Sequence, residues 1–237
     1  MDINFWCNRN KTLNEASQKA WIATEQLIEA LDQITLSKTI PAPEFNKWNP
    51  DSLIDYVINT HDQYAKENAV IIYDMIQNVA SHHGNNHPEL RKLATVIFLF
   101  LHDLLNHMKR EEQILLPNIK QLIKKKSRSN KGRYTTFGLI EESVRQMQKA
   151  HQAISKDLQL LQDITNNYML PEDASISYKH LFEKLKEFEE DLLLHFHLEN
   201  NILFPKVLAE DKELDKNEVA YLNAKNNSYA KKANQTE

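Results

Sequence analysis

The stretch DLLNHMKREEQILLP at residues 103–117 decides the fold, and DLLLHFHLENNILFP at residues 191–205 repeats its pattern. Both copies read Asp-x3-His-x3-Glu-x2-Ile-Leu-x-Pro. Residues four apart share one face of a helix, with Cβ atoms about 5–6 Å from each other. Each copy therefore directs a histidine and a glutamate toward the same place. Two copies in one apolar frame indicate a metal site built from a duplicated helical hairpin.

The composition favours a soluble all-α protein. Only three glycines and seven prolines occur in 237 residues, which argues against many short strands. No apolar run is long enough to predict a membrane helix, and the first residues lack a secretory signal pattern. A net charge of −4 gives no electrostatic reason to expect nucleic acid binding. The single cysteine, Cys7, excludes an internal disulfide and fits a reducing, cytoplasmic location.

The chain divides into three predicted parts. These are a short N-terminal helical segment at 1–40, a four-helix bundle at 50–209 and a polar tail at 210–237. Asn49 followed by Pro50 is typical of a helix start. Four long periodic segments follow, at about 51–82, 89–123, 138–166 and 172–209.

Each of these four segments carries an apolar stripe that includes one histidine. The stripe of the second segment comprises Leu93, Ile97, Phe100, Leu104, His107, Glu111 and Ile114, and that of the fourth comprises Leu181, Leu185, Phe188, Leu192, His195, Glu199 and Ile202. Steps of three and four predict a buried helix seam. The first segment carries His61 on a looser stripe of the same kind. The third segment carries His151 on a regular one.

The four histidines are predicted to lie at one depth. In an antiparallel hairpin, residues equally far from the turn lie at the same level. The midpoints of consecutive seam histidines fall at Gly84, Ser129 and Asp173, and all three lie in segments with turn composition. We therefore expect an up-down-up-down four-helix bundle in which the four histidines converge on one layer. Glu111 and Glu199 lie about one turn beyond it.

Burial of two carboxylates and four imidazoles is costly unless cations or hydrogen bonds compensate for it. Two metal ions would compensate, each taking two histidines while both glutamates bridge. Mixed imidazole and carboxylate donors suit iron, manganese or zinc, and shared carboxylates in a bundle core favour two iron ions. Asp103 and Asp191, each one turn before its histidine, are expected to accept the free imidazole N–H of that histidine.

Other candidate residues favour plainer interpretations. His82, His83 and His87 lie in the predicted first turn, too far along the helix to reach the layer. Cys7 is interpreted as a small apolar residue rather than a reactive thiol. The basic stretch at 120–133 is interpreted as a solvated turn.

The chain resembles the hemerythrin-like di-iron proteins of the repair of iron centres family. The resemblance is carried by the two repeated motifs, by HHGNNHPEL at 82–90, and by TNNY at 165–168 followed by Pro171. The resemblance spans about residues 50–209. It implies a bacterial cytoplasmic protein that helps restore iron–sulfur clusters damaged by nitric oxide or oxidants. It also implies a non-haem site with two iron ions, bridged by oxo or hydroxo and by the two glutamates. The implied ligands are His61, His107, Glu111, His151, His195 and Glu199.

The N-terminal segment departs from that family pattern. The family usually has a small N-terminal domain with adjacent cysteines followed by glycines. Here NFWCNRNKTL at residues 4–13 retains only Cys7, followed by Asn8. The segment resembles a shortened form of that domain, and a thiol role is not carried over to it.

Three functions are compatible with such a site. The centre could supply iron for cluster repair, bind and reduce nitric oxide as an enzyme, or carry or sense oxygen as hemerythrin-like proteins do. The expected partners are damaged iron–sulfur proteins, with nitric oxide or oxygen as small ligands, and neither nucleic acid nor a membrane. The sequence leaves open which function holds, and whether the chain is a monomer or a homodimer.

Overall fold

The computed structural model describes residues 12–19, 22–26, 28–29, 43–127, 139–213 and 216. Within these residues all regular secondary structure is helical, which confirms the predicted all-α class. Cys7, and most of the predicted N-terminal and C-terminal segments, lie outside the described residues. The predicted divisions at residues 40 and 210 stay predictions.

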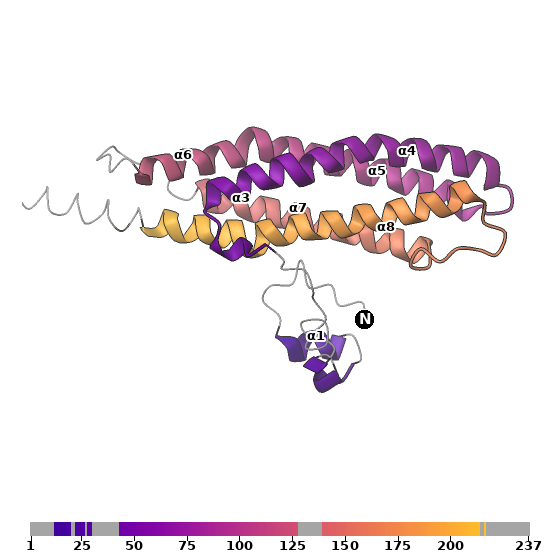
Figure 1. Ribbon diagram of the computed structural model, residues 1–237, viewed down its shortest axis with the longest axis horizontal. Helices are drawn as coiled ribbons and strands as arrows, with labels where there is room; N and C mark the ends of the chain where they lie inside the picture. The colour runs from indigo at the N-terminus through magenta and orange to yellow at the C-terminus, as the bar shows by residue number, and fades with distance from the viewer. Residues whose placement is uncertain are drawn as a thin grey trace, which may run out of the picture.

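Four long helical rods run antiparallel to one another and form the predicted up-down-up-down bundle (Figure 1). The first rod consists of α3 (Pro50–Tyr56), a π-helical turn η2 (Val57–Asp62) and α4 (Gln63–His83). The second consists of α5 (Glu89–Arg110), the π-helical turn η3 (Glu111–Leu115) and α6 (Leu116–Ser127). The third is α7 (Leu139–Ile164). The fourth consists of α8 (Ile176–His197), the π-helical turn η4 (Leu198–Leu203) and helical residues 204–213.

Two short elements precede or flank these rods. They are α1 (Leu13–Lys19) and the 3-10 turn η1 (Phe45–Lys47). Within the bundle, α4 packs against α5 and α8, and α5 packs against α7. The first rod begins as predicted, because the Asn49 side chain accepts a hydrogen bond from the Ser52 amide at 2.8 Å and Pro50 follows it.

The apolar core is divided into two clusters by the layer that holds the four seam histidines. One cluster lies among α4, α5, α7 and α8 and includes Ile72, Ile97, Leu158 and Phe188. The other lies toward α3, α6 and η4 and includes Leu53, Ile119 and Phe204. Along each rod, the histidine falls where residues of one cluster give way to residues of the other. The predicted polar layer therefore lies inside the core rather than at its end.

The seam prediction is wrong at Ile114. Its side chain is 54% exposed, whereas the adjacent Leu115 is fully buried. Ile114 lies in the π-helical turn η3, which departs from the α-helical spacing assumed from the sequence, whereas Ile202 at the matching position of η4 is buried.

The predicted turns at Gly84 and Asp173 are confirmed, because α4 ends at His83 and α8 begins at Ile176. Gly84 is required by close packing, since a Cβ atom there would lie 2.3 Å from the Ala80 carbonyl oxygen. The third predicted turn, at Ser129, lies outside the described residues. The basic stretch before it is helical up to Ser127, so the part of it at 120–127 is not the turn that was predicted.

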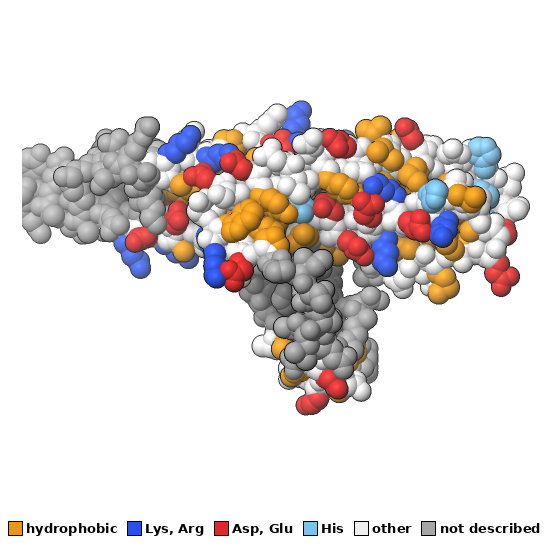
Figure 2. Space-filling model, viewed as in Figure 1, with side chains coloured by type: hydrophobic (Ala, Val, Ile, Leu, Met, Phe, Trp, Pro, Cys, Tyr) orange, Lys and Arg blue, Asp and Glu red, His pale blue; other side chains and the backbone are white. Residues whose placement is uncertain are grey.

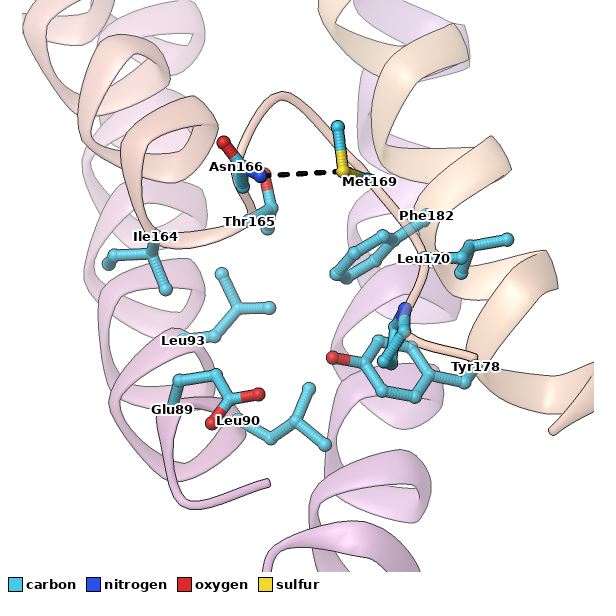
Figure 3. A pocket seen from close by; sticks show the side chains of 11 residues that line it. Glu89, Leu90, Leu93, Ile164, Thr165, Asn166, Met169, Leu170, Tyr178 and Phe182 are labelled. Atoms are coloured by element: carbon cyan, nitrogen blue, oxygen red, sulfur yellow. Dashed lines mark hydrogen bonds between the residues drawn. The ribbon is translucent and has the colours of Figure 1, made fainter. Parts of the chain in front are cut away.

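The two turns at the far end of the bundle, remote from the histidine layer, contact each other. His83 Nε2 lies 2.8 Å from Ser175 Oγ, and His87 Nε2 lies 3.0 Å from Asp173 Oδ1. Between the turns is a cavity of about 230 Å³, in which Leu90 and Leu93 face Tyr178 and Phe182 (Figure 3). This placement agrees with the prediction that the three histidines of the first turn do not join the layer.

The α7–α8 connection is held in a strained conformation. Asn166, Asn167 and Tyr168 have φ of 48°, 56° and 59°. Asparagine tolerates this left-handed region, whereas an aromatic residue rarely adopts it. Buried Glu189 stabilises the conformation, since it accepts hydrogen bonds from the Tyr168 hydroxyl and from Gln162 Nε2, both at 2.6 Å.

We expect Tyr168→Phe to lower the free energy of unfolding by about 1.5–3 kcal/mol, the usual contribution of a hydrogen bond to a charged group. Chemical denaturation measures the effect. The matched control is Tyr73→Phe on α4, where Tyr73 packs against Phe98 at the surface. The control should change stability by less than about 0.5 kcal/mol. Equal effects at the two positions would contradict the role given to Glu189.

The contact between His87 and Asp173 should make stability depend on pH. The hydrogen bond to Asp173 raises the pKa of His87 above 6.5, so its stabilising contribution is complete below pH 6.5 and is lost as pH rises through the raised value. The same bond lowers the pKa of Asp173 below 3.8, so its contribution is complete above pH 3.8 and is lost as pH falls through the lowered value.

The difference in Tm between the wild type and His87→Gln should therefore be largest at about pH 5 and shrink toward about pH 9. His82→Gln is the matched control, because His82 is exposed near the end of α4 and, among the described residues, its hydrogen bonds are to Asn78 and Ser81 of its own helix. A His87→Gln difference that stays constant across this range would show that charge plays no part in the contact.

Candidate metal centre

The structure brings all six predicted ligands into one buried layer. Each has an exposed fraction of 2% or less. The first rod contributes His61 from η2, the second His107 from α5 and Glu111 from η3, the third His151 from α7, and the fourth His195 from α8 and Glu199 from η4. Their convergence from four rods is a geometric fact, and their role as ligands stays a prediction.

Two histidines and the two glutamates form a first donor group. His107 Nε2 and His151 Nε2 lie 2.9 Å apart. Glu199 Oε2 lies 3.2 Å from His151 Nε2, and Glu111 Oε2 lies 3.6 Å from His107 Nε2. One donor atom from each of these four residues lies within 4.8 Å of the other three. A cluster this close could hold a metal ion.

The other two histidines form a second donor group with the same glutamates. The His61 and His195 rings are stacked with centroids 6.0 Å apart. Glu199 Oε1 lies 3.1 Å from His195 Nε2, and Glu111 Oε2 lies 4.0 Å from the same atom. Glu199 therefore has one oxygen beside each histidine pair, as the sequence argument expected of a bridging carboxylate.

A third carboxylate, from Asp62, enters the layer and was missed by the sequence analysis. Asp62 is fully buried, and its Oδ1 lies 3.6 Å from His195 Nε2. Neighbouring residues in an α-helix point about 100° apart, so spacing arguments do not place both His61 and Asp62 inside a bundle. Both are buried here because they end the π-helical turn η2. The signal in the sequence is only the adjacency of histidine and aspartate.

Three of the four rods change from α-helical to π-helical at the layer. The turns η2, η3 and η4 contain His61, Glu111 and Glu199 respectively. A single π-helical turn inserted in an α-helix is rare and is frequently found at a functional site. The deviations from regular helix coincide with the predicted ligands, which makes the layer a specialised part of the bundle.

The outer hydrogen bonds of the imidazoles differ from those expected. Asp103 is exposed and His107 Nδ1 has no hydrogen-bond partner among the described residues, so the prediction that Asp103 holds His107 is wrong. Asp191 does not hold His195 on its own helix. Instead, its Oδ1 lies 2.9 Å from His61 Nδ1 on the facing rod. The fixed bond on Nδ1 leaves Nε2 of His61 for the interior of the layer.

Asn200 supplies a second outer contact that the sequence analysis missed. Its Oδ1 lies 3.0 Å from His151 Nδ1, which leaves His151 Nε2 pointing into the layer. Asn200 follows Glu199 in the π-helical turn η4, so one turn provides both a predicted ligand and the group that orients another. Spacing by three or four residues could not reveal this pair.

Aromatic side chains enclose the layer. The Phe196 ring stacks on His151 with centroids 4.2 Å apart, and the Tyr56 ring meets His61 edge-on at 5.4 Å. Tyr56 also packs against Phe45 and Trp48. These rings exclude water from the imidazoles and lower the local dielectric constant. On the outer surface, acidic and basic side chains are interspersed along the face drawn in Figure 2.

The donors present fit a metal ion. Both oxygens of Glu111, Glu199 and Asp62 are buried without a hydrogen-bond partner among the described residues, as is Nε2 of His61 and of His195. Burial of a polar atom without a partner costs about 1–3 kcal/mol, and more when the atom is charged. Imidazole nitrogen and carboxylate oxygen suit iron, manganese or zinc. A cation among these atoms would satisfy all of them.

The charges of the layer are mutually dependent. Burial and the nearby Glu199 carboxylate raise the pKa of Glu111 well above its usual value. Burial also disfavours ionisation of Glu199, but the His195 and His151 imidazoles outweigh it and hold the pKa of Glu199 well below its usual value. Burial lowers the pKa of His195, yet Glu199 and Asp62 outweigh this effect and raise that pKa to about 9. Without a cation, the layer therefore retains protons at neutral pH, and metal binding would displace them.

Comparisons with known proteins agree with a metal centre. The family described as Hemerythrin HHE cation binding domain matches residues 52–207. The chain is 29% identical over 213 residues to a Haemophilus influenzae protein named "Probable iron-sulfur cluster repair protein", with 88% of each chain covered. It is 28% identical over 209 residues to "Iron-sulfur cluster repair protein YtfE" of Yersinia pseudotuberculosis, with 87% of each chain covered. The protein of the same name from Yersinia pestis gives the same identity and coverage.

Within the described residues, every helix is too short or too polar to span a membrane. The family match covers well over half of the chain and includes all six predicted ligands together with Asp62. With its four antiparallel rods and its buried layer of histidines and carboxylates, the chain belongs to the hemerythrin HHE cation-binding domain family.

Proposed function

We propose that this chain binds two non-haem iron ions and helps to repair iron–sulfur clusters damaged by nitric oxide or oxidative stress, by supplying iron. The observation that carries the proposal is the buried layer of four imidazoles and three carboxylates. Within it the carboxylate oxygens, and Nε2 of His61 and of His195, lack a hydrogen-bond partner among the described residues. The names of the relatives from Haemophilus influenzae and Yersinia support cluster repair as the process.

The six predicted residues divide into two metal positions. His107 and His151 serve one ion, and His61 and His195 serve the other. Glu111 and Glu199 bridge, because each lies beside histidines of both pairs. Asp191 and Asn200 orient His61 and His151 from outside. An oxo or hydroxo bridge between the ions stays a prediction.

The donor set suits an iron store that can also release its iron. Imidazole and carboxylate are exchangeable donors whose affinity for metal falls as they gain protons, and the described part of the layer contains no thiolate. Iron held in this way would be available to a damaged cluster protein. When loaded, the iron pair would supply redox and small-molecule binding chemistry.

A second candidate function is binding and reduction of nitric oxide. The observation that favours it is the first donor group, in which one donor atom from each of four protein residues lies close to the other three; an ion held by four protein donors could accept a further ligand. An oxygen carrier or sensor is the third candidate and has no further support here. The client proteins, a homodimeric state and a cytoplasmic location also stay predictions.

Metal content tests the ligand assignment. Protein made with plentiful iron and purified without chelators should contain about two irons per chain by elemental analysis, as in other two-metal bundles. His195→Ala and Glu199→Ala should each lose most of this iron, because each removes a donor from the layer. The matched control is His102→Ala, an exposed histidine on α5, which should keep wild-type content. Wild-type protein with no metal, or with one zinc ion, would contradict the iron centre.

Iron transfer tests the function. Iron-loaded protein should restore activity to a hydratase whose [4Fe–4S] cluster has been damaged by nitric oxide, and the iron of the donor should appear in the client. Metal-free wild type and iron-treated His195→Ala should restore little. Catalytic production of nitrous oxide without iron transfer would instead support the second candidate function.

A further inference from the structure

Asp62 is an ionisable side chain in the layer that does not belong to the set of six predicted ligands. It is fully buried, and neither carboxylate oxygen has a hydrogen-bond partner among the described residues. Its neighbour Glu112 is paired with Lys66, and burial raises the pKa of Asp62 to about 7. A carboxylate in this setting is stable only if something inside the layer compensates for it.

The position of Asp62 breaks the symmetry between the two donor groups. Its Oδ1 lies 3.6 Å from His195 Nε2, and the preceding residue in η2 is His61. Asp62 therefore lies with the His61 and His195 pair. The other pair, His107 and His151, has the two shared glutamates and no third carboxylate within the group.

We propose that Asp62 is a seventh protein ligand, which binds only the metal ion held by His61 and His195. This inference rests on the proposed function, because it presumes two metal ions in the layer. It makes the two positions unequal, with five protein donors at one and four at the other. The ion at the position of His107 and His151 is then the more weakly held and the first to leave for a client.

The alternative, that Asp62 only forms an ion pair with His195, fits the geometry less well. Such a pair would bring a carboxylate oxygen to about 2.7–2.9 Å of an imidazole nitrogen, with the N–H aligned on it. The observed separation is 3.6 Å, and neither His195 Nε2 nor either Asp62 oxygen takes part in a hydrogen bond within the described chain. The two groups face a common space rather than each other.

The experiment is stepwise metal binding and release, measured on the full chain. Anaerobic titration of metal-free wild type with Co(II), followed by visible absorption, should show two resolved steps. Removal of Fe(II) from the loaded protein by a ferrous chelator should show two phases of equal amplitude. Asp62→Asn should weaken the tighter step at least about 10–100-fold, the loss usual even for outer partners of a ligand. It should also merge the two release phases.

Asp55→Asn is the matched control, because Asp55 lies on the same rod, is exposed and pairs with Lys120 at the surface. It should leave both steps and both phases unchanged. Metal-free Asp62→Asn should unfold at a temperature no lower than the wild type, whereas a purely structural ion pair with His195 predicts a lower one. Asp62→Glu, which retains the carboxylate, should keep two steps.

The results separate this assignment from the function on which it rests. Wild type that binds two ions in one step and releases them in one phase would overturn the inequality of the positions without use of any variant. If Asp62→Asn binds metal in the same two steps and with the same affinities as the wild type, the ligand role of Asp62 is overturned while the two-metal centre remains. Wild type that binds no metal would overturn both.

Discussion

Burial of charge is the constraint on which this structure depends. Four imidazoles and three carboxylates occupy a layer between two apolar clusters. Within the described residues, the carboxylate oxygens and Nε2 of His61 and of His195 have no hydrogen-bond partner there. Desolvation of so many ionisable groups opposes folding, and mutual proton sharing reduces the cost only in part, as the opposed shifts of Glu111 and Glu199 show. Cations are the compensation that the donor set fits, so a bound metal ion would contribute to the stability of the fold as well as to its chemistry.

The π-helical turns are how a regular bundle accommodates this layer. An α-helix presents one inward side chain about every three or four residues, which would give each rod one donor per turn. In η2 and η4 the wider turn buries two consecutive polar residues, His61 with Asp62 and Glu199 with Asn200. The π-helical turns, which are less favourable than regular α-helix, therefore occur where they bring a second polar side chain into the layer.

Much of the architecture could be predicted from the sequence, because it depends on spacing. The repeated motif, the single histidine on each stripe and the turn composition at the midpoints place the four rods and bring the six predicted ligands together. Prediction failed where the helix departs from α-helical geometry. Ile114, whose exposure was not predicted, lies in such a turn, and so do Asp62 and Asn200, which were missed. The pairing of Asp191 with His61 could not be predicted either, because it joins facing rods whose relative rotation is set by packing.

The division of the apolar core into two clusters also bears on how the molecule opens. Each cluster is a separate body of buried surface, and the rods that join them pass through a layer whose buried polar atoms a bound cation would satisfy. Local unfolding follows such boundaries, because the free energy of opening is lowest where buried contacts are interrupted. Loss of metal would thus uncouple the two halves and let the end built from α3, α6 and η4 fray while the longer half stays folded. Release of the metal ions and loosening of one half of the bundle would then occur together.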